Sequence, residues 1–273
     1  MAITSGPEQP LSAYPFRPVR LATDRHDFDA RPDGTSYIRC REPLARHAGR
    51  VTDWLVHFAA AAPHRTFVAK RDRAGSWQTL TYAEALRRAE TLGGALLAQG
   101  LSADRPLVIL SGNDLDHAAL ALAAMHAGIP YAPVSPAYST IGGGFERLRD
   151  VLGLLTPGLV FAADGAVFGK AIAATLDRDV PVIVRTGSLP DREPIPLARF
   201  GEDGRGDIGA AHASVTPDTI AKFLFTSGST GLPKAVITTH GMLCANAAQL
   251  QTSFPFLTDE PPRSGRGCAS SRA

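Results

Sequence analysis

The sequence predicts an α/β fold with a largely parallel sheet flanked by helices, and the alternation of its apolar segments carries this prediction. Short apolar runs, each long enough for one buried strand, alternate with segments of helical periodicity. This alternation is the pattern of parallel strands joined by crossover helices. The expected strands are 106–110, 129–134, 158–163 and 180–184, and the expected helices are 114–127, 145–155 and 166–176.

A strand pair and a well-marked helix precede this repeat. Thr81 and Glu84 have the spacing of a capping box, in which a hydroxyl and a carboxylate each satisfy a free backbone N–H. Apolar or small residues then recur on one helical face as far as residue 97, and Gly100 stands where a left-handed residue ends a helix. Upstream we expect a helix stopped by Pro63, then strands at 66–71 and 76–80.

The composition is that of a globular protein and argues against several kinds of partner. Apolar residues make up 44% of the chain, charged residues 20%, and the formal net charge is +2. That charge is too small to indicate nucleic acid or an anionic membrane surface. Cys40, Cys244 and Cys268 lie far apart without metal-ligand spacing, which fits a reducing compartment.

Neither a secretory leader nor a membrane span is expected. The first twenty residues hold no apolar core, and the most apolar segment, 117–134, is interrupted by histidine, glycine and proline. It therefore falls short of the roughly 20 apolar residues that a bilayer crossing needs. We predict a cytoplasmic protein.

The most distinctive chemistry lies in residues 222–234, KFLFTSGSTGLPK. The apolar residues before this loop and the β-branched AVITT after it predict two strands, so the loop joins strand to strand. Hydroxyls can donate to anionic oxygens, glycines let backbone N–H groups approach a ligand, and a lysine adds a positive charge. The predicted phosphate-binding residues are Thr226, Ser227, Gly228, Ser229, Thr230, Gly231 and Lys234.

Two common motifs do not describe this loop. A Walker sequence has four residues between its first glycine and its Gly-Lys pair, whereas Gly228 and Gly231 are three apart and Pro233 precedes Lys234. A Ser-x-x-Lys motif is excluded because Gly231 stands three residues before the lysine. A glycine- and serine-rich hairpin with an exposed lysine stays the alternative to a phosphate site.

The segment FTSGSTGLPKA closely resembles the phosphate-binding signature of the adenylate-forming superfamily, which includes acyl-CoA synthetases, luciferases and nonribosomal peptide adenylation domains. The resemblance covers roughly residues 30–262. PYAPVSPAYS, LLTPGLVFAADG and FLFTSGSTGLPKAVITTHGMLCAN look most like feruloyl-CoA synthases. Ala235 departs from the wider superfamily, where glycine usually follows the lysine, but is similar to the feruloyl-type branch.

The resemblance implies an ATP-dependent acid–CoA ligase acting on a small-molecule carboxylic acid, an aromatic hydroxycinnamate such as ferulate. ATP, Mg²⁺ and CoA are the implied cofactors and co-substrates, with the loop at the β- and γ-phosphates. No residue of this chain is predicted as catalytic. A non-catalytic nucleotide-binding remnant and an unrelated doubly wound binding protein are the alternatives.

Composition and the resemblance together indicate the expected domains. Residues 1–50 are an extended lead-in, 51–262 a partial AMP-binding domain, and 263–273 an atypical tail rich in arginine, glycine and serine. Family enzymes are about twice this length, so we expect an incomplete N-terminal portion that is inactive alone. We expect the tail to come from a shifted reading frame or a premature end. Residues 187–217 are an expected surface connection.

Three further features favour structural roles. The segment 110–117 reads as a strand-to-helix turn, capped by Asn113 or Asp114. The three glycines at 142–144 indicate a helix entry or hinge. His240 follows the second strand of the loop, and the other histidines form no spaced cluster.

Overall fold

The computed structural model describes residues 19–22, 26–72, 74–142, 144–202, 206–226 and 233–258. The chain divides into two compact units. The sheet unit comprises residues 47–244, and the flanking unit comprises residues 1–46 with 245–273.

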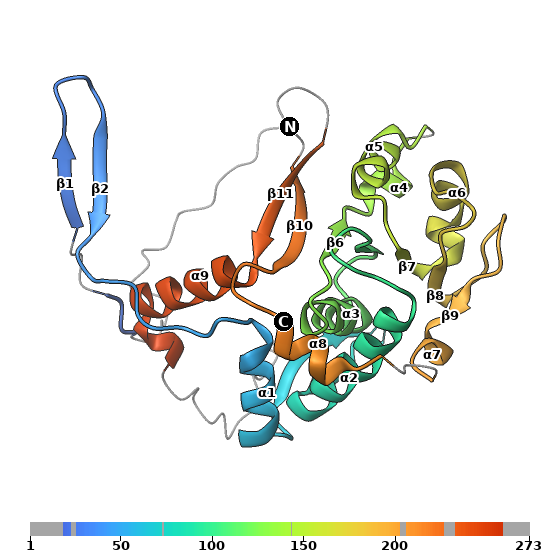
Figure 1. Cartoon of the computed structure of the whole chain (residues 1–273), viewed down its shortest axis with the longest axis horizontal. Helices are drawn as coiled ribbons and strands as arrows, with labels where there is room; N and C mark the ends of the chain where they lie inside the picture. The colour runs from blue at the N-terminus through green and yellow to red at the C-terminus, as the bar shows by residue number, and fades with distance from the viewer. Residues whose placement is uncertain are drawn as a thin grey trace, which may run out of the picture. The chain divides into compact units, whose positions relative to one another are not determined.

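A seven-stranded sheet forms the centre of the sheet unit, in the order β11-β10-β6-β5-β7-β8-β9 (Figure 1). Neighbouring strands are parallel except for β11, which runs antiparallel to β10 at one edge. The central strand β5 is wholly buried and sets Leu107 opposite both Tyr131 and Leu159. The strands are β5 (Leu107–Leu110), β6 (Tyr131–Val134), β7 (Leu159–Asp164), β8 (Val182–Thr186), β9 (Ile195–Pro196), β10 (Ile220–Thr226) and β11 (Lys234–Thr239).

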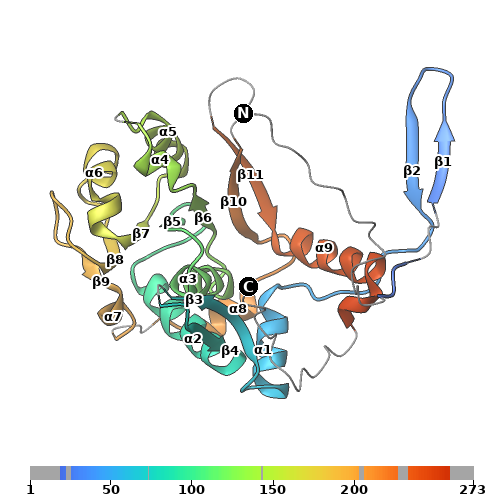
Figure 2. The same ribbon diagram turned by 180° about the vertical axis from the view of Figure 1, so that it is seen from behind.

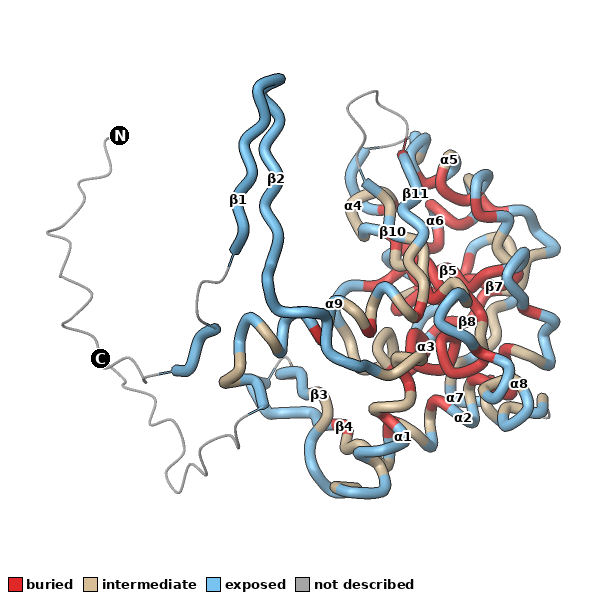
Figure 3. The backbone as a smooth tube through the Cα atoms, turned by 60° about the vertical axis from the view of Figure 1, so that its left-hand side comes forward, coloured by how far each residue is buried: buried red, intermediate tan, exposed pale blue. Residues whose placement is uncertain are grey.

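Helices cover both faces of this sheet, as the two opposite views show (Figures 1 and 2). One group consists of α1 (Thr52–Ala61), α2 (Tyr82–Ala98), α3 (Leu115–His126) and α8 (Ile208–Ser214). The other consists of α4 (Ala137–Thr140), α5 (Glu146–Leu155) and α6 (Gly165–Thr175). Figure 3 shows that buried residues concentrate on β5, β7, β8 and α3. The predicted α/β class with a largely parallel sheet is therefore confirmed.

The predicted local signals are present. Thr81 and Glu84 form both bonds of the capping box at the start of α2. Gly100 has a φ of 71° just beyond that helix, in the left-handed region that glycine adopts without steric cost. The strand pair ahead of α2 is antiparallel, β3 (Thr66–Arg71) with β4 (Trp77–Thr81).

The segment 187–217 is more than a surface connection. It contributes β9, which pairs Ile195 with Ile183, and two helices, α7 (Leu197–Phe200) and α8. Phe200 and Val215 are buried, at 5% and 6% exposure. The expectation of a plain connection was wrong because these short elements form by packing on the sheet and α2, which composition does not indicate.

The flanking unit holds an antiparallel hairpin, β1 (His26–Ala30) with β2 (Ser36–Cys40), that the sequence analysis did not predict. All residues of both strands are exposed. α9 (His240–Ser253) begins in the sheet unit and ends in the flanking unit, followed by the 3-10 helix η2 (Pro255–Thr258). The predicted tail, 263–273, lies outside the described residues.

The described part of the chain contains no helix that combines the length and apolarity needed to cross a bilayer.

Candidate functional site

The structure places the predicted loop between two antiparallel strands, as expected. β10 ends at Thr226 and β11 begins at Lys234, and these two residues stand opposite each other in the register. Opposite residues of an antiparallel pair have Cα atoms roughly 4.5–5.5 Å apart. The backbone positions that carry the Thr226 hydroxyl and the Lys234 ammonium are therefore close together. Ser227, Gly228, Ser229, Thr230 and Gly231 lie outside the described residues.

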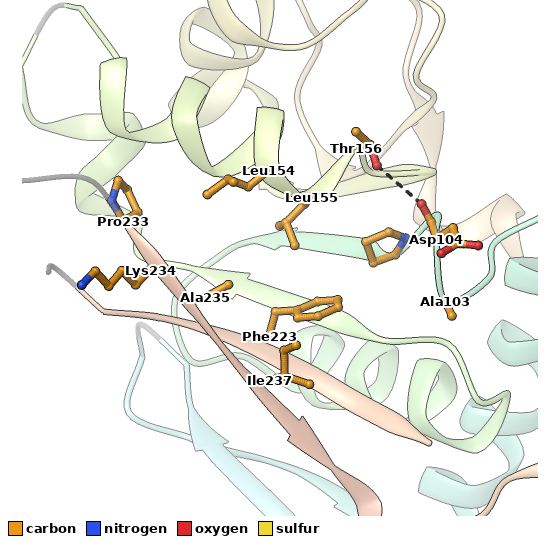
Figure 4. A pocket seen from close by; sticks show the side chains of 11 residues that line it. Ala103, Asp104, Leu154, Leu155, Thr156, Phe223, Pro233, Lys234, Ala235 and Ile237 are labelled. Carbon is orange, nitrogen blue, oxygen red and sulfur yellow. Dashed lines mark hydrogen bonds between the residues drawn. The ribbon is translucent and has the colours of Figure 1, made fainter. Parts of the chain in front are cut away.

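Lys234 is exposed, and no carboxylate of the described residues forms an ion pair with it. In Figure 4 its Nζ atom points away from Phe223 and Ile237. An ammonium without an internal carboxylate can bind an anion at no cost in broken ion pairs. Thr226, also exposed, adds a hydroxyl donor on the facing strand.

A cavity of about 580 Å³ adjoins Lys234 (Figure 4). The hairpin, the end of α5 and the turn before β5 each contribute part of its wall. The lining residues are Ala103, Asp104, Pro106, Leu154, Leu155, Thr156, Phe223, Pro233, Lys234, Ala235 and Ile237. The Thr156 hydroxyl donates to the Asp104 carbonyl at 3.5 Å and joins two parts of the wall. A largely apolar lining with few charged groups suits an organic body better than a triphosphate.

A sequence profile of the family described as "AMP-binding enzyme" matches residues 55–262. The chain belongs to this family. Its fold matches the N-terminal portion of adenylate-forming enzymes, so the sheet and the β10–β11 hairpin are parts of the AMP-binding enzyme fold.

Curated relatives include several kinds of AMP-binding enzyme. The chain is 28% identical over 211 residues to phosphinothricin tripeptide synthetase PhsB of Streptomyces viridochromogenes, covering 76% of this chain and 16% of that protein. It is 32% identical over 174 residues to an L-proline–[L-prolyl-carrier protein] ligase of Streptomyces coelicolor, covering 60% and 30%. A putative fatty-acid–CoA ligase, fadD21 of Mycobacterium leprae, is 30% identical over 185 residues, covering 68% and 30%. The chain thus spans between 16% and 30% of the length of these relatives.

Two solved structures illustrate the likeness in fold. VinN in complex with 3-methylaspartate matches 76% of this chain and 52% of its own, with a TM-score of 0.56 and 25% identity. A fatty acyl-adenylate ligase from L. pneumophila, in complex with acyl adenylate and pyrophosphate, has a TM-score of 0.56 at 19% identity, over 76% of this chain and 33% of its own. The second likeness shows the fold alone.

Asp114 caps α3, where its carboxylate accepts a hydrogen bond from the Asp116 N–H at 2.8 Å. Asn113 does not cap that helix. The Asp114 side chain is 7% exposed and also forms ion pairs with Arg185 and, at 3.8 Å, with Lys70. Burial alone raises the pKa of Asp114, but the Arg185 hydrogen bond and the other contacts lower it more, so the carboxyl stays charged. Because Asp114 is already paired with Arg185 and Lys70, this network has a structural role.

The remaining sequence candidates also read as structure. α5 begins at Glu146 after Phe145, whose φ is 53°, so the glycine-rich stretch leads into a helix start; Gly143 lies outside the described residues. The described part of the chain holds no group of three metal-ligating side chains. The sheet unit also contains a histidine cluster that the sequence does not predict, because its members have no regular spacing along the chain. The rings of His126 and His212 stack at 3.9 Å, and His240 lies near them.

Proposed function

We propose that this AMP-binding enzyme chain carries the triphosphate-binding loop of an ATP-dependent acid–thiol ligase. The observation that carries the proposal is the arrangement of the loop, in which Thr226 and an exposed Lys234 face each other across an antiparallel pair, and Lys234 has no carboxylate partner among the described residues. Family membership supplies the reaction class, because the family's relatives include acid–CoA ligases and carrier-protein ligases.

Each loop residue has a proposed role at the phosphates. Backbone N–H groups around Gly228 and Gly231 approach the β- and γ-phosphates, and the hydroxyls of Thr226, Ser227, Ser229 and Thr230 donate to their oxygens. Lys234 neutralises part of their charge. The exposed hydroxyl and ammonium at the loop's ends fit such a ligand. Mg²⁺ would bind mostly through phosphate oxygens and water, as is usual for this ion with nucleotides, and would offset the remaining charge.

The proposed reaction has two displacements. A carboxylate oxygen of the acid bonds to the α-phosphorus of ATP as the bond to the β-phosphate bridging oxygen breaks, which gives an acyl-adenylate and pyrophosphate. The thiol of CoA then loses its proton to solvent as its sulfur bonds to the acyl carbon, the acyl–oxygen bond breaks, and AMP leaves with that electron pair. The loop acts in the first step by stabilising charge on the departing pyrophosphate. ATP and CoA as substrates suit a cytoplasmic protein.

The proposed acid is an aromatic hydroxycinnamate such as ferulate. The support is the resemblance of residues 130–139, 154–165 and 223–246 to feruloyl-CoA synthases. Two relatives are named for other acids, proline and fatty acids, and VinN was solved in complex with 3-methylaspartate. A small-molecule acid, with neither nucleic acid nor a membrane as partner, is part of the proposal.

ATP–pyrophosphate exchange tests the reaction class and the acid together. The purified chain is assayed with ferulate, p-coumarate, L-proline, L-aspartate and a long-chain fatty acid. Exchange that depends on ferulate or p-coumarate supports the full proposal, and exchange with another acid of the panel overturns the hydroxycinnamate part. Because an N-terminal portion is expected to be inactive alone, ATP binding without exchange fits both the ligase portion and the non-catalytic nucleotide-binding alternative, and the absence of ATP binding overturns both.

Lys234→Ala tests the loop directly. Losing a hydrogen bond to a charged group costs about 1.5–3 kcal/mol, or roughly tenfold to a hundredfold in ATP affinity. AMP affinity should change much less, because the loop serves the leaving phosphates. Lys170→Ala, at an exposed lysine of α6, is the matched control and should leave both affinities unchanged. Equal losses of ATP and AMP affinity in Lys234→Ala would contradict the assignment, and Lys234→Arg should restore binding only in part.

A further inference from the structure

The hairpin that carries the loop has little support from the sheet. Among the described residues, β10 pairs with β6 only through Lys222 opposite Tyr131. By contrast, β5 pairs along its whole length, Leu107–Leu110, with β6 and with β7. Within the described part of the chain, β11 pairs with β10 alone. Ladder hydrogen bonds therefore fix the hairpin's position much less firmly than they fix the central strands.

Packing along the hairpin's length supports β10, where Phe223 and Phe225 pack partly against the core, more than it supports β11. Leu224 on β10 and Val236 and Ile237 on β11 are 37%, 48% and 53% exposed. Because consecutive strand residues point to opposite faces, the exposure of both Val236 and Ile237 means that neither face of β11 is covered in the sheet unit. The position of β11 must therefore be set by its pairing with β10 and by its attachment at the base of the hairpin.

The base is fastened where β11 turns into α9. The His240 N–H donates to the Thr219 carbonyl at 3.0 Å, and the Gly241 N–H donates to the Pro217 carbonyl at 2.8 Å. A Cβ atom at Gly241 would lie 3.0 Å from the Pro217 carbonyl oxygen, so this close approach favours glycine. These bonds tie the end of β11 to the residues just before β10.

The His240 side chain extends this fastening to α1. Its Nδ1 atom accepts a hydrogen bond from the Val51 N–H, at 3.2 Å, and the residue is fully buried. An accepting Nδ1 requires the proton on Nε2, which has no partner among the described residues. Burial lowers the pKa of His240 to about 4, so the ring is neutral near pH 7. The ionisable groups that act on it are Asp53, His212 and Arg50.

We propose that His240 is a positioning residue for the phosphate-binding loop, holding the base of the β10–β11 hairpin to the start of α1. Its effect on ATP rests on the proposed function, whereas its effect on the hairpin does not. β11 links His240 directly to Lys234, so motion at the base is carried along one strand to the loop. A slip of one residue between β10 and β11 would turn Lys234 to the opposite face.

Two variants at position 240 separate the hydrogen bond from the volume of the ring. His240→Asn keeps an acceptor near the position of Nδ1, and His240→Leu fills the space without one. Val51→Pro removes the donor from the other side of the same bond. Proline suits this position because Val51 has a φ of −59°.

Hydrogen exchange of the full chain, read by mass spectrometry, measures the anchor without any nucleotide. We expect His240→Leu and Val51→Pro to speed exchange of Lys234–Thr239 about tenfold, and His240→Asn to stay within about threefold of the wild type. Leu107–Leu110 should be unchanged, which reports that the sheet is intact. Unchanged exchange of Lys234–Thr239 in Val51→Pro, or exchange in His240→Asn as fast as in His240→Leu, overturns the proposal.

Nucleotide affinity tests the consequence for the loop. ATP affinity should fall about tenfold in His240→Leu and recover in His240→Asn, while AMP affinity changes less than about twofold. If the wild-type chain binds no ATP, the proposed function fails, and hydrogen exchange alone tests whether His240 holds the base of the hairpin. If the wild type binds ATP and His240→Leu binds it equally well, the positioning role is wrong.

Discussion

Acidification should destabilise the sheet unit through its buried histidines, and His126 offers a direct measurement. His126 is the last residue of α3, is 4% exposed, and stacks on His212 with ring centroids 3.9 Å apart. Burial, followed by the nearby His212 and Arg50, lowers the pKa of His126 to about 4. Arg50 already holds a positive charge here, donating to Asp53 Oδ1 at 2.8 Å and to the His212 carbonyl at 2.9 Å.

The sign follows from the proton balance. An unfolded histidine has a pKa of roughly 6.5, so between about pH 6.5 and pH 4 the unfolded chain binds a proton that folded His126 does not. Stability from this residue is therefore complete above about pH 6.5 and is lost as the pH falls toward 4. At pH 5 the loss is about 2 kcal/mol for His126, a large part of a typical stability of roughly 5–15 kcal/mol.

His126→Met removes the titrating group and keeps an apolar side chain of similar size. Urea titrations at pH 7.5 and pH 5.0 give the loss of unfolding free energy on acidification. This loss should be about 2 kcal/mol smaller in the variant than in the wild type. His57→Gln, at an exposed histidine of α1, is the control and should keep the wild-type difference. A pH difference in His126→Met as large as that of the wild type would refute the reasoning.

Two further predictions concern stability at neutral pH. Asp114→Ala should lower the free energy of unfolding by about 2–3 kcal/mol, because it removes both a helix cap and the partner of Arg185. Asp114→Asn keeps a cap acceptor and should lower that free energy less. Equal losses for the two variants in urea titrations would argue against a contribution from the charge. Gly153→Ala should raise the free energy of unfolding by about 0.5–1 kcal/mol, because Gly153 lies within α5 with open space around it. Gly165→Ala should lower it by about 1–3 kcal/mol, because the new Cβ atom would lie 2.5 Å from the Ser188 carbonyl oxygen. Melting temperatures of the two variants that shift in the same direction would contradict this pair of predictions.

The elements predicted correctly are those whose signals are local. The capping box needs Thr81 and Glu84 to be three residues apart, and both bonds form. The buried strands were visible as short apolar runs because a parallel sheet is covered on both faces. The elements missed are those that depend on distant partners. β9 is two residues long and exists through its pairing with β8, and the β1–β2 hairpin has no residue buried enough to leave an apolar pattern.

The candidate site divides along the same line. The loop could be recognised from the sequence because its hydroxyls, glycines and lysine lie within nine residues, Thr226 to Lys234, and because strand patterns stand on both sides. His240 was visible as a residue after the second strand, but its partner Val51 is 189 positions away. His126 and His212 likewise come from α3 and α8, and they meet because the fold packs those helices together.

Substitutions in the loop and substitutions at the base of the hairpin should have different effects. Substitutions within the loop act on groups proposed to touch phosphate, so their effects should follow the charge and hydrogen bonding of the ligand. Substitutions at Val51, His240 or Gly241 touch no ligand, yet they act where β11, a strand exposed on both faces in the sheet unit, is attached. Their effects should depend on how well ordered β11 is, and they should appear in hydrogen exchange before any nucleotide is added. A comparison of the two groups of variants therefore separates the chemistry of the loop from the structure that holds it, which the loop sequence alone cannot do.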